Sequence, residues 1–277
     1  QWGQVDWPYP CHSMRKSLLS GLIGCYVDEG KIELTKTLAT LNINDKQMLT
    51  EIERTASIAD LITSRSGVYL PAAYSPEEMT TRLPPRGSHV PGTYWYYNNW
   101  DFNALGTIFR QETGADIFED FDRRVARPLG MQDYRASAQR YIFEDVSDHP
   151  AYAFRMSARD LARFGLLYAR NGKWKRRQIL SEAWVRDSVT PHVEFATGGY
   201  GYLWWTTRKD ADELFGCHTE VGAFAASGSH GHLLCVLPKS DIVIVHRVNS
   251  AIDGNDVSGP ELKTLIEHIL AARPSTR

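Results

Sequence analysis

A serine and a lysine lie three positions apart in the stretch Cys11-His12-Ser13-Met14-Arg15-Lys16. Apolar residues recur with helical spacing after it and predict a helix over about 13–29, with Ser13 at the N-cap or in the first turn. Residues three apart share one face of a helix, so we expect the Ser13 hydroxyl and the Lys16 amine to be neighbours. A serine with a base beside it is the arrangement that acyl transfer uses. The same spacing also arises by chance, and the rest of the chain must decide between the two.

A second candidate stretch is the aromatic run Tyr94–Asp101, which precedes a helix predicted over 101–113. It contains two overlapping Y-x-N triplets, Tyr96/Asn98 and Tyr97/Asn99. The simplest interpretation is a loop whose Asn99 or Asp101 caps the helix. A third stretch, Ala226-Ser227-Gly228, ends a predicted strand and leads into a tight turn.

Taken together, these three stretches resemble the serine β-lactamase/penicillin-binding-protein superfamily. The likeness is greatest to the class C β-lactamase-like serine hydrolases, which include family VIII esterases, aminohexanoate-oligomer hydrolases and D-peptidases. Four further stretches resemble this branch, at residues 57–67, 128–131, 157–165 and 200–205. The family pattern places a helix glycine seven residues after the asparagine, which Asn99 and Gly106 match. That spacing favours Tyr97/Asn99 over the other triplet.

The resemblance implies a role for each residue that matches a family motif. It makes Ser13 the nucleophile, Lys16 and Tyr97 the general base and acid, and Asn99 the residue that orients Lys16 or the substrate. The oxyanion hole would consist of the backbone N–H groups of Ser13 and Ser229. The expected substrate-binding residues are Ser227, Gly228, His230 and Trp204. The resemblance implies neither a metal nor a cofactor.

The third motif departs from the family pattern at one position. Family members carry a K-T-G-like triplet whose lysine helps to recognise a substrate carboxylate, and Ala226 stands in that place here. The difference argues against a penicillin-type substrate, and His230 or His232 could replace part of the lysine's role. We therefore expect a serine hydrolase that acts on a small ester or amide through an acyl-Ser13 intermediate. Two alternatives are a β-lactamase or D-peptidase, and a catalytically inactive sensor or binding module on the same fold.

The order of predicted elements indicates an α+β fold of the β-lactamase/transpeptidase-like class. Short β-branched and aromatic runs after Gly199, at 200–207, 214–219, 224–228, 233–237 and 242–248, predict an antiparallel sheet. The first helix and a last helix over 260–272 flank it. We expect one catalytic domain over 1–277, with an inserted helical subdomain at about 31–190 and a sheet part at about 1–30 and 191–277. A long loop over 71–92, with one helical turn near 76–79, is expected to shape the pocket.

The family usually has one or more strands before the S-x-x-K helix, whereas twelve residues precede Ser13 here. We expect those strands to be missing, with Trp2-Gly3 as the end of one of them. The sheet would then have an exposed edge, which a homodimer partner or another segment would cover.

The bulk composition is typical of a globular protein in water. The net charge of −2 and the absence of a long cationic run argue against a nucleic-acid surface. No apolar run approaches the ~18–20 residues of a membrane span. The four cysteines, Cys11, Cys25, Cys217 and Cys235, are expected to be free and mostly buried, with one disulfide if the protein is exported. Cytoplasmic and exported locations both fit the sequence.

Overall fold

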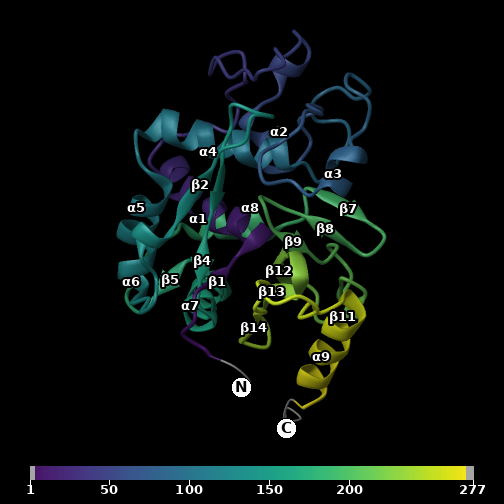
Figure 1. Ribbon diagram of the computed structural model, residues 1–277. Coiled ribbons are helices and arrows are strands. Elements are labelled where there is room, and N and C mark those ends of the chain that lie inside the picture. The colour runs from purple at the N-terminus through teal and green to yellow at the C-terminus, as the bar shows by residue number, and fades with distance from the viewer. Residues whose placement is uncertain (1–3, 273–277) are drawn as a thin grey trace. The chain divides into compact units, whose positions relative to one another are not determined.

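The computed structural model describes residues 4–272 and has an α+β fold, as predicted (Figure 1). The helices are α1 (Arg15–Asp28), α2 (Ile58–Ile62), α3 (Glu77–Thr81), α4 (Asn99–Thr113), α5 (Ile117–Phe121), α6 (Arg127–Leu129), α7 (Ala158–Ala169), α8 (Glu182–Val189) and α9 (Gly259–Ala271). The strands are β1 (Tyr9–Pro10), β2 (Arg140–Ile142), β3 (Ala151–Ala153), β4 (Arg155–Met156), β5 (Lys173–Trp174), β6 (Arg177–Gln178), β7 (Val193–Phe195), β8 (Gly198–Tyr200), β9 (Trp205–Thr206), β10 (Glu213–Leu214), β11 (Cys217–His218), β12 (Phe224–Gly228), β13 (His232–Leu237) and β14 (Ile242–His246).

Contacts divide the chain into two compact units. Among the described residues, the sheet unit comprises 4–17, 126–134 and 155–272, and the helical unit comprises 18–125 and 135–154. Helix α1 therefore begins in the sheet unit and continues in the helical unit.

This division differs from the expected one, because α7, α8 and residues 126–134 belong with the sheet. Helix α7 packs on β13 and β14 at Gly165, where a side chain would overlap Leu234 and Val243. The carboxylate of Asp160 on α7 also accepts the backbone N–H groups of Gln132, Asp133 and Tyr134.

The sheet unit is built on a six-stranded antiparallel sheet of order β14-β13-β12-β9-β8-β7. The runs predicted near residues 224–228, 233–237 and 242–248 form β12, β13 and β14. The run predicted at 200–207 is instead interrupted between β8 and β9, where Leu203 adopts a φ of 64°. The run at 214–219 is a hairpin, because Phe215 and Gly216 have φ angles of 55° and 74°, which turn the chain between β10 and β11. Among the described residues, β14 and β7 are the edges of the sheet, and β1 pairs with β4. Trp2 and Gly3 lie outside the described residues.

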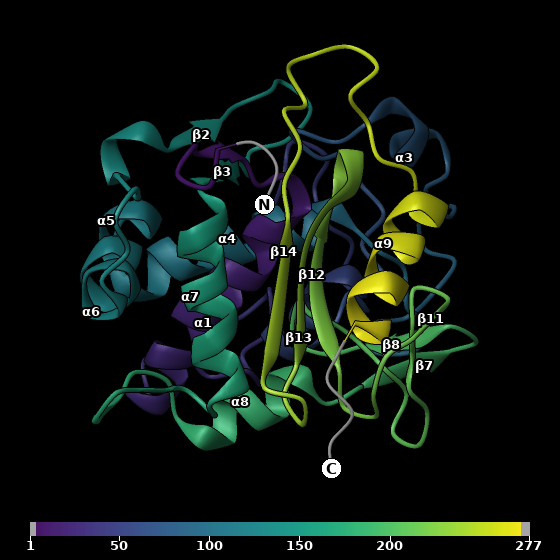
Figure 2. The ribbon, with the colours of Figure 1, turned by 90° about the horizontal axis from the view of Figure 1, so that it is seen from below.

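Helices cover both faces of the C-terminal strands. Figure 2 shows α7 on one side of β12, β13 and β14 and α9 on the other. Leu234 and Val236 face α7, whereas the neighbours with opposite parity, Leu233 and Cys235, belong to the apolar core beneath α9. This alternation follows from the two-residue period of a strand and assigns each side chain of β12 and β13 to one face.

The helical unit centres on α4, which begins and ends as the sequence signals suggest. The Asn98 side chain accepts the Trp100 N–H as the N-cap, and Gly114 closes the helix with a φ of 67°. The predicted caps, Asn99 and Asp101, lie one and three residues later, and the helix begins two residues before the predicted start at 101. Gly106 allows α4 to lie close to β3, since a Cβ there would be 2.7 Å from the Tyr152 ring.

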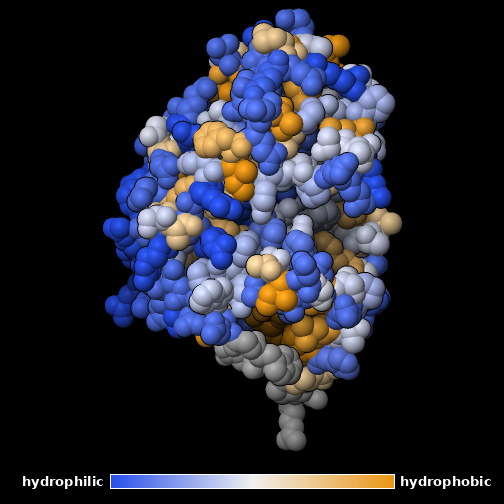
Figure 3. Space-filling model, in the orientation of Figure 1, coloured by the Kyte–Doolittle hydropathy of each residue, from blue (hydrophilic) through white to orange (hydrophobic). Residues whose placement is uncertain are grey.

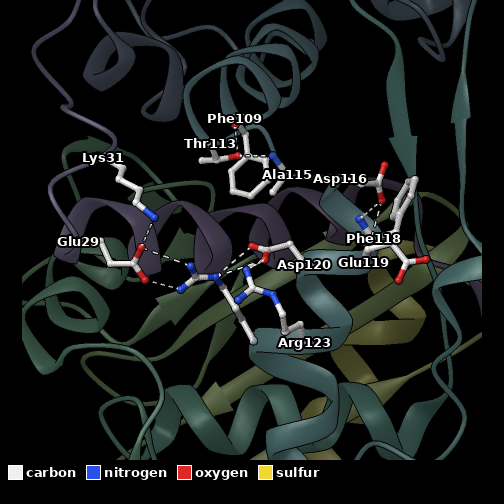
Figure 4. Close-up of polar contacts among 11 residues, drawn as sticks. Glu29, Lys31, Phe109, Thr113, Ala115, Asp116, Phe118, Glu119, Asp120 and Arg123 are labelled. Carbon is white, nitrogen blue, oxygen red and sulfur yellow. Dashed lines mark hydrogen bonds and ion pairs between the residues drawn. The ribbon is translucent and has the colours of Figure 1, made fainter.

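An ion-pair network supports the end of α1 in the helical unit (Figure 4). The Arg124 guanidinium donates to Glu29 at 2.6 Å and also pairs with Asp120, which pairs in turn with Arg123. Lys31 lies 3.1 Å from the same Glu29 carboxylate. The Lys31–Glu29 pair is exposed and contributes little by itself, whereas the Asp120 carboxylate is buried. A network that shares one guanidinium between two carboxylates contributes more than an isolated surface pair.

No helix in the described part of the chain is long and apolar enough to cross a membrane. The four cysteines lie in the described part of the chain, are buried, and form no disulfide there.

Candidate active site

Ser13 and Lys16 are neighbours, as their spacing predicted. Ser13 does not cap a helix but lies in a 3₁₀ turn, His12–Met14, which leads directly into α1. The Lys16 Nζ is 2.8 Å from the Ser13 Oγ. Lys16 is 2 % exposed, and this burial, together with the charge of Arg15, holds its pKa well below the usual value for a lysine. A neutral amine in this position can accept a proton from the serine hydroxyl.

The end of β12 lies against the turn that carries Ser13. A Cβ on Gly228 would be 2.7 Å from the Cys11 carbonyl oxygen and 3.3 Å from the His12 Cβ. Only a glycine allows the two backbones to come this close. Ser229 follows Gly228 directly, so it comes next in the chain after this close contact with the turn that contains Ser13.

Three histidines cluster beside this contact. The His12 ring lies 4.8 Å from the His230 ring and 5.1 Å from the His232 ring, measured between centroids. Burial and neighbouring positive charge lower the pKa of His12 to about 4 and that of His232 to about 2, so both are neutral at pH 7. The His230 Nδ1 pairs with Asp256 at 2.7 Å, and the His12 Nε2 bonds the Ser250 hydroxyl at 3.0 Å.

His230 and His232 do not lie together on one face of a strand. His230 lies in the turn Ser229–Gly231 with a φ of 69°, and His232 begins β13 with its side chain 0 % exposed. His12 also has a positive φ, 46°. Left-handed backbone at non-glycine residues is costly and concentrates at functional sites.

Tyr97 and Asn99 belong to the helical unit, at the start of α4. The Asn98 side chain makes structural contacts: its oxygen caps α4, and its amide donates to the Val68 carbonyl at 2.6 Å. Asn99 instead directs its amide at the Ser75 hydroxyl, 3.1 Å away in the long loop over 71–92. The two asparagines therefore have different partners, and the role of Tyr97 and Asn99 stays a prediction.

Ser64 holds the backbone around this triplet and was missed in the sequence. Its hydroxyl donates to the Tyr96 carbonyl at 2.6 Å and accepts the Asn98 N–H at 3.0 Å. The signal was present in the family-like stretch over 57–67, which includes Ser64, but a serine in a loop has no distinctive spacing.

Trp204 was expected to bind substrate, but its side chain is buried in the core. Its side chain is 0 % exposed and packs against Phe164, Tyr168 and Phe224 in the core of the sheet unit. The neighbouring Leu203 has a different use, since its carbonyl accepts the Ser17 hydroxyl of α1 at 2.6 Å.

A serine–lysine pair at the start of a helix, beside the end of an antiparallel strand, defines the class of β-lactamase/transpeptidase-like serine hydrolase folds. The sequence profile of the Beta-lactamase family matches residues 4–267, and the chain belongs to this family. No curated protein sequence matches the chain.

Solved structures show the same fold at low sequence identity. A Bacillus anthracis protein assigned as a 6-aminohexanoate-dimer hydrolase has a TM-score of 0.72 and 23% identity, over 99% of this chain and 76% of that one. A penicillin-binding protein from Bacillus halodurans has a TM-score of 0.66 and 18% identity, over 96% and 87% of the two chains. The hydrolase EstCE1, described as having promiscuous acyltransferase activity, has a TM-score of 0.66 and 16% identity, over 95% and 85%.

Proposed function

We propose that this protein is a serine hydrolase that cleaves a small ester or amide through an acyl-Ser13 intermediate. The observation that carries the proposal is the Lys16 amine, which is buried 2.8 Å from the Ser13 hydroxyl with a lowered pKa. A serine hydroxyl is a weak nucleophile unless a base lies within hydrogen-bond reach, and a desolvated lysine supplies such a base.

In the proposed mechanism the Ser13 Oγ attacks the substrate carbonyl while Tyr97, assisted by Lys16, takes the hydroxyl proton. The same proton passes to the leaving group as the carbonyl–heteroatom bond breaks. Water then attacks the acyl-enzyme, loses a proton to the Tyr97–Lys16 pair, and the released Ser13 recovers one. Asn99 orients Lys16 or the substrate.

The oxyanion that forms on the carbonyl would be bound by the backbone N–H groups of Ser13 and Ser229. The approach of Gly228 to Cys11 supports this pairing, because it draws the end of β12 towards the nucleophilic turn. Donors of this kind are worth ~2.7–4 kcal/mol each in other acyl-transfer enzymes.

The polar groups around β12 favour a neutral ester or amide over a penicillin-type substrate. Ala226 occupies the place of the family lysine. The lowered pKa values leave His12 and His232 uncharged, and His230 is already paired with Asp256. Ala226 and the three histidines therefore provide little positive charge for a substrate carboxylate.

A fluorophosphonate probe tests the nucleophile directly. We expect the wild-type protein to be labelled and Ser13→Ala to lose labelling. The control Ser20→Ala, at a buried serine of α1, should keep it. Turnover of a nitrophenyl ester without turnover of a chromogenic cephalosporin would distinguish the esterase from a β-lactamase. Absence of labelling in the folded wild-type protein would instead favour the inactive sensor or binding module.

A further inference from the structure

A cavity of about 320 Å³ lies between α9 and the face of the sheet that is turned away from α7. Its lining comes from the end of β12 with the turn after it, the start of β13, the β10–β11 hairpin, and the first half of α9. The lining residues on β12 and β13, Ser227 and Leu233, are cross-strand partners. They have the parity of Ala225 and Cys235 in the core beneath α9, so the cavity lies on that face. The size falls at the lower end of the range for small-molecule sites.

The cavity has a mainly apolar lining with a smaller set of polar groups. The apolar wall consists of Phe215, Cys217, Leu233, Leu262 and Ile266. Ser227, Ser229, His230 and Lys263 supply the polar groups. In Figure 3, apolar surface gathers beside α9 and the C-terminal strands.

The charge of the lining has one sign. Among the described residues, no aspartate or glutamate lines the cavity, and Lys263 is its one side chain with a permanent positive charge. The Lys263 side chain is 43% exposed, and its ammonium lies 3.7 Å from the Glu267 carboxylate. An ammonium has three N–H donors, so this pair leaves donors for a ligand. His230 turns its Nδ1 to Asp256.

We propose that this cavity binds an amphiphilic carboxylate, such as a medium-chain fatty acid. The alkyl chain lies along the apolar wall, and the carboxylate accepts hydrogen bonds from the Lys263 ammonium and from the hydroxyls of Ser227 and Ser229. Burial of an alkyl chain supplies most of the affinity, at ~0.8 kcal/mol per CH₂. The charge-assisted contact selects the anionic head.

Occupation of the cavity would also affect acyl transfer. The cavity shares residues 227–231 with the strand end assigned to the oxyanion hole, so a bound carboxylate at Ser229 would alter the rate at which Ser13 is acylated. This effect rests on the proposed function, whereas binding does not.

Cys217 lines the cavity and is 1 % exposed, so a maleimide reaches its thiol only when the cavity opens. A ligand that keeps the cavity closed therefore slows the modification of Cys217. Decanoate is expected to slow maleimide modification of Cys217, followed by peptide mass, and to do so at about tenfold lower concentration than decanol. Lys263→Glu should weaken decanoate binding about tenfold and leave decanol unchanged. Lys239→Glu, an exposed lysine away from the lining, is the matched control. Leu262→Trp, which fills the cavity, should abolish protection by both ligands.

Two outcomes would overturn the proposal. Equal protection by decanoate and decanol, unchanged in Lys263→Glu, would remove the carboxylate preference. Protection that persists in a folded Leu262→Trp protein would place the ligand elsewhere. Ser13→Ala should still bind decanoate, so failure of the hydrolase function leaves this test intact. A change of fluorophosphonate rate with decanoate in the wild type, absent in Leu262→Trp, would establish the coupling.

Discussion

The burial of Lys16 lowers the stability of the fold and also lowers the pKa of its amine. Burial disfavours its charged form and lowers its pKa, which costs free energy of folding at every pH below the value of an unfolded lysine. Between the two pKa values the unfolded state binds more protons, so this cost decreases as the pH rises. The same desolvation makes the amine a usable base near Ser13.

Replacement of Lys16 by methionine separates these two effects. We expect Lys16→Met to abolish acylation and to raise the free energy of unfolding at pH 7 by about 1–2 kcal/mol, because an apolar side chain of similar length carries no desolvation cost. Urea unfolding and fluorophosphonate labelling of the same samples would measure both. A variant that is less stable than the wild type would contradict the assignment of a desolvated base.

Tyr97 has a matched control one residue earlier in the chain. We expect Tyr97→Phe to lower the acylation rate by about 10²–10⁴, the usual contribution of a general acid–base group. Tyr96→Phe should keep wild-type activity, since the Tyr96 hydroxyl only approaches the Met79 carbonyl, at 3.5 Å. Initial rates of nitrophenyl ester hydrolysis by the two variants and the wild type would test this expectation. A fully active Tyr97→Phe protein would remove Tyr97 from the mechanism.

At the scale of elements, two glycines let structural elements approach closely, with different consequences. A methyl group on Gly228 would overlap the Cys11 carbonyl, and one on Gly106 would overlap the Tyr152 ring, each at 2.7 Å. Both overlaps should destabilise the fold by about 1–3 kcal/mol. Gly228→Ala displaces β12 from the nucleophilic turn, whereas Gly106→Ala disturbs α4 and β3.

We therefore expect Gly228→Ala to lose most acylation activity while Gly106→Ala retains it in the folded protein. Labelling rates should be compared at a temperature where circular dichroism shows both variants folded. Equal losses of activity would mean that Gly228 acts through general stability and not through the position of the oxyanion donors.

At the scale of the whole molecule, Asp101 makes stability depend on pH. Burial raises the pKa of its carboxyl group well above the usual value, although Ser66 and Asn98 donate hydrogen bonds to it. The folded state then holds a proton that the unfolded state releases above about pH 4. The free energy of unfolding should accordingly fall as the pH rises from about 4 towards the pKa of the folded state.

An amide of the same shape cannot ionise, so Asp101→Asn should flatten this dependence and be more stable than the wild type near pH 7. Urea unfolding at several pH values between 5 and 8 measures the pH dependence of the free energy of unfolding for both proteins. Parallel pH profiles for the two proteins would show that Asp101 is ionised in the folded state.

The features that depend only on residues close in the chain, such as helix starts and the S-x-x-K pair, could be predicted from the sequence. Ser57, Ser157, Ser181 and Ser258 cap helices where the apolar periodicity begins, because a cap acts within one turn of its own residue. The S-x-x-K pair is likewise local, and helical spacing alone places the Lys16 amine beside Ser13. The resemblance of motifs in the right order gave the fold class before any coordinates.

Tertiary structure decided what depends on residues far apart in the chain. Leu203 breaks a predicted strand because its backbone turns left-handed where Ser17 of α1 bonds its carbonyl. Trp204 joins the core and not the pocket because α7 and β12 enclose it. The contact of Gly228 with Cys11 and the histidine cluster likewise join segments that are about two hundred residues apart. The cavity beneath α9 forms where that helix meets β12, β13 and the β10–β11 hairpin. Side-chain burial and backbone approach are set by such partners, and no local pattern encodes them.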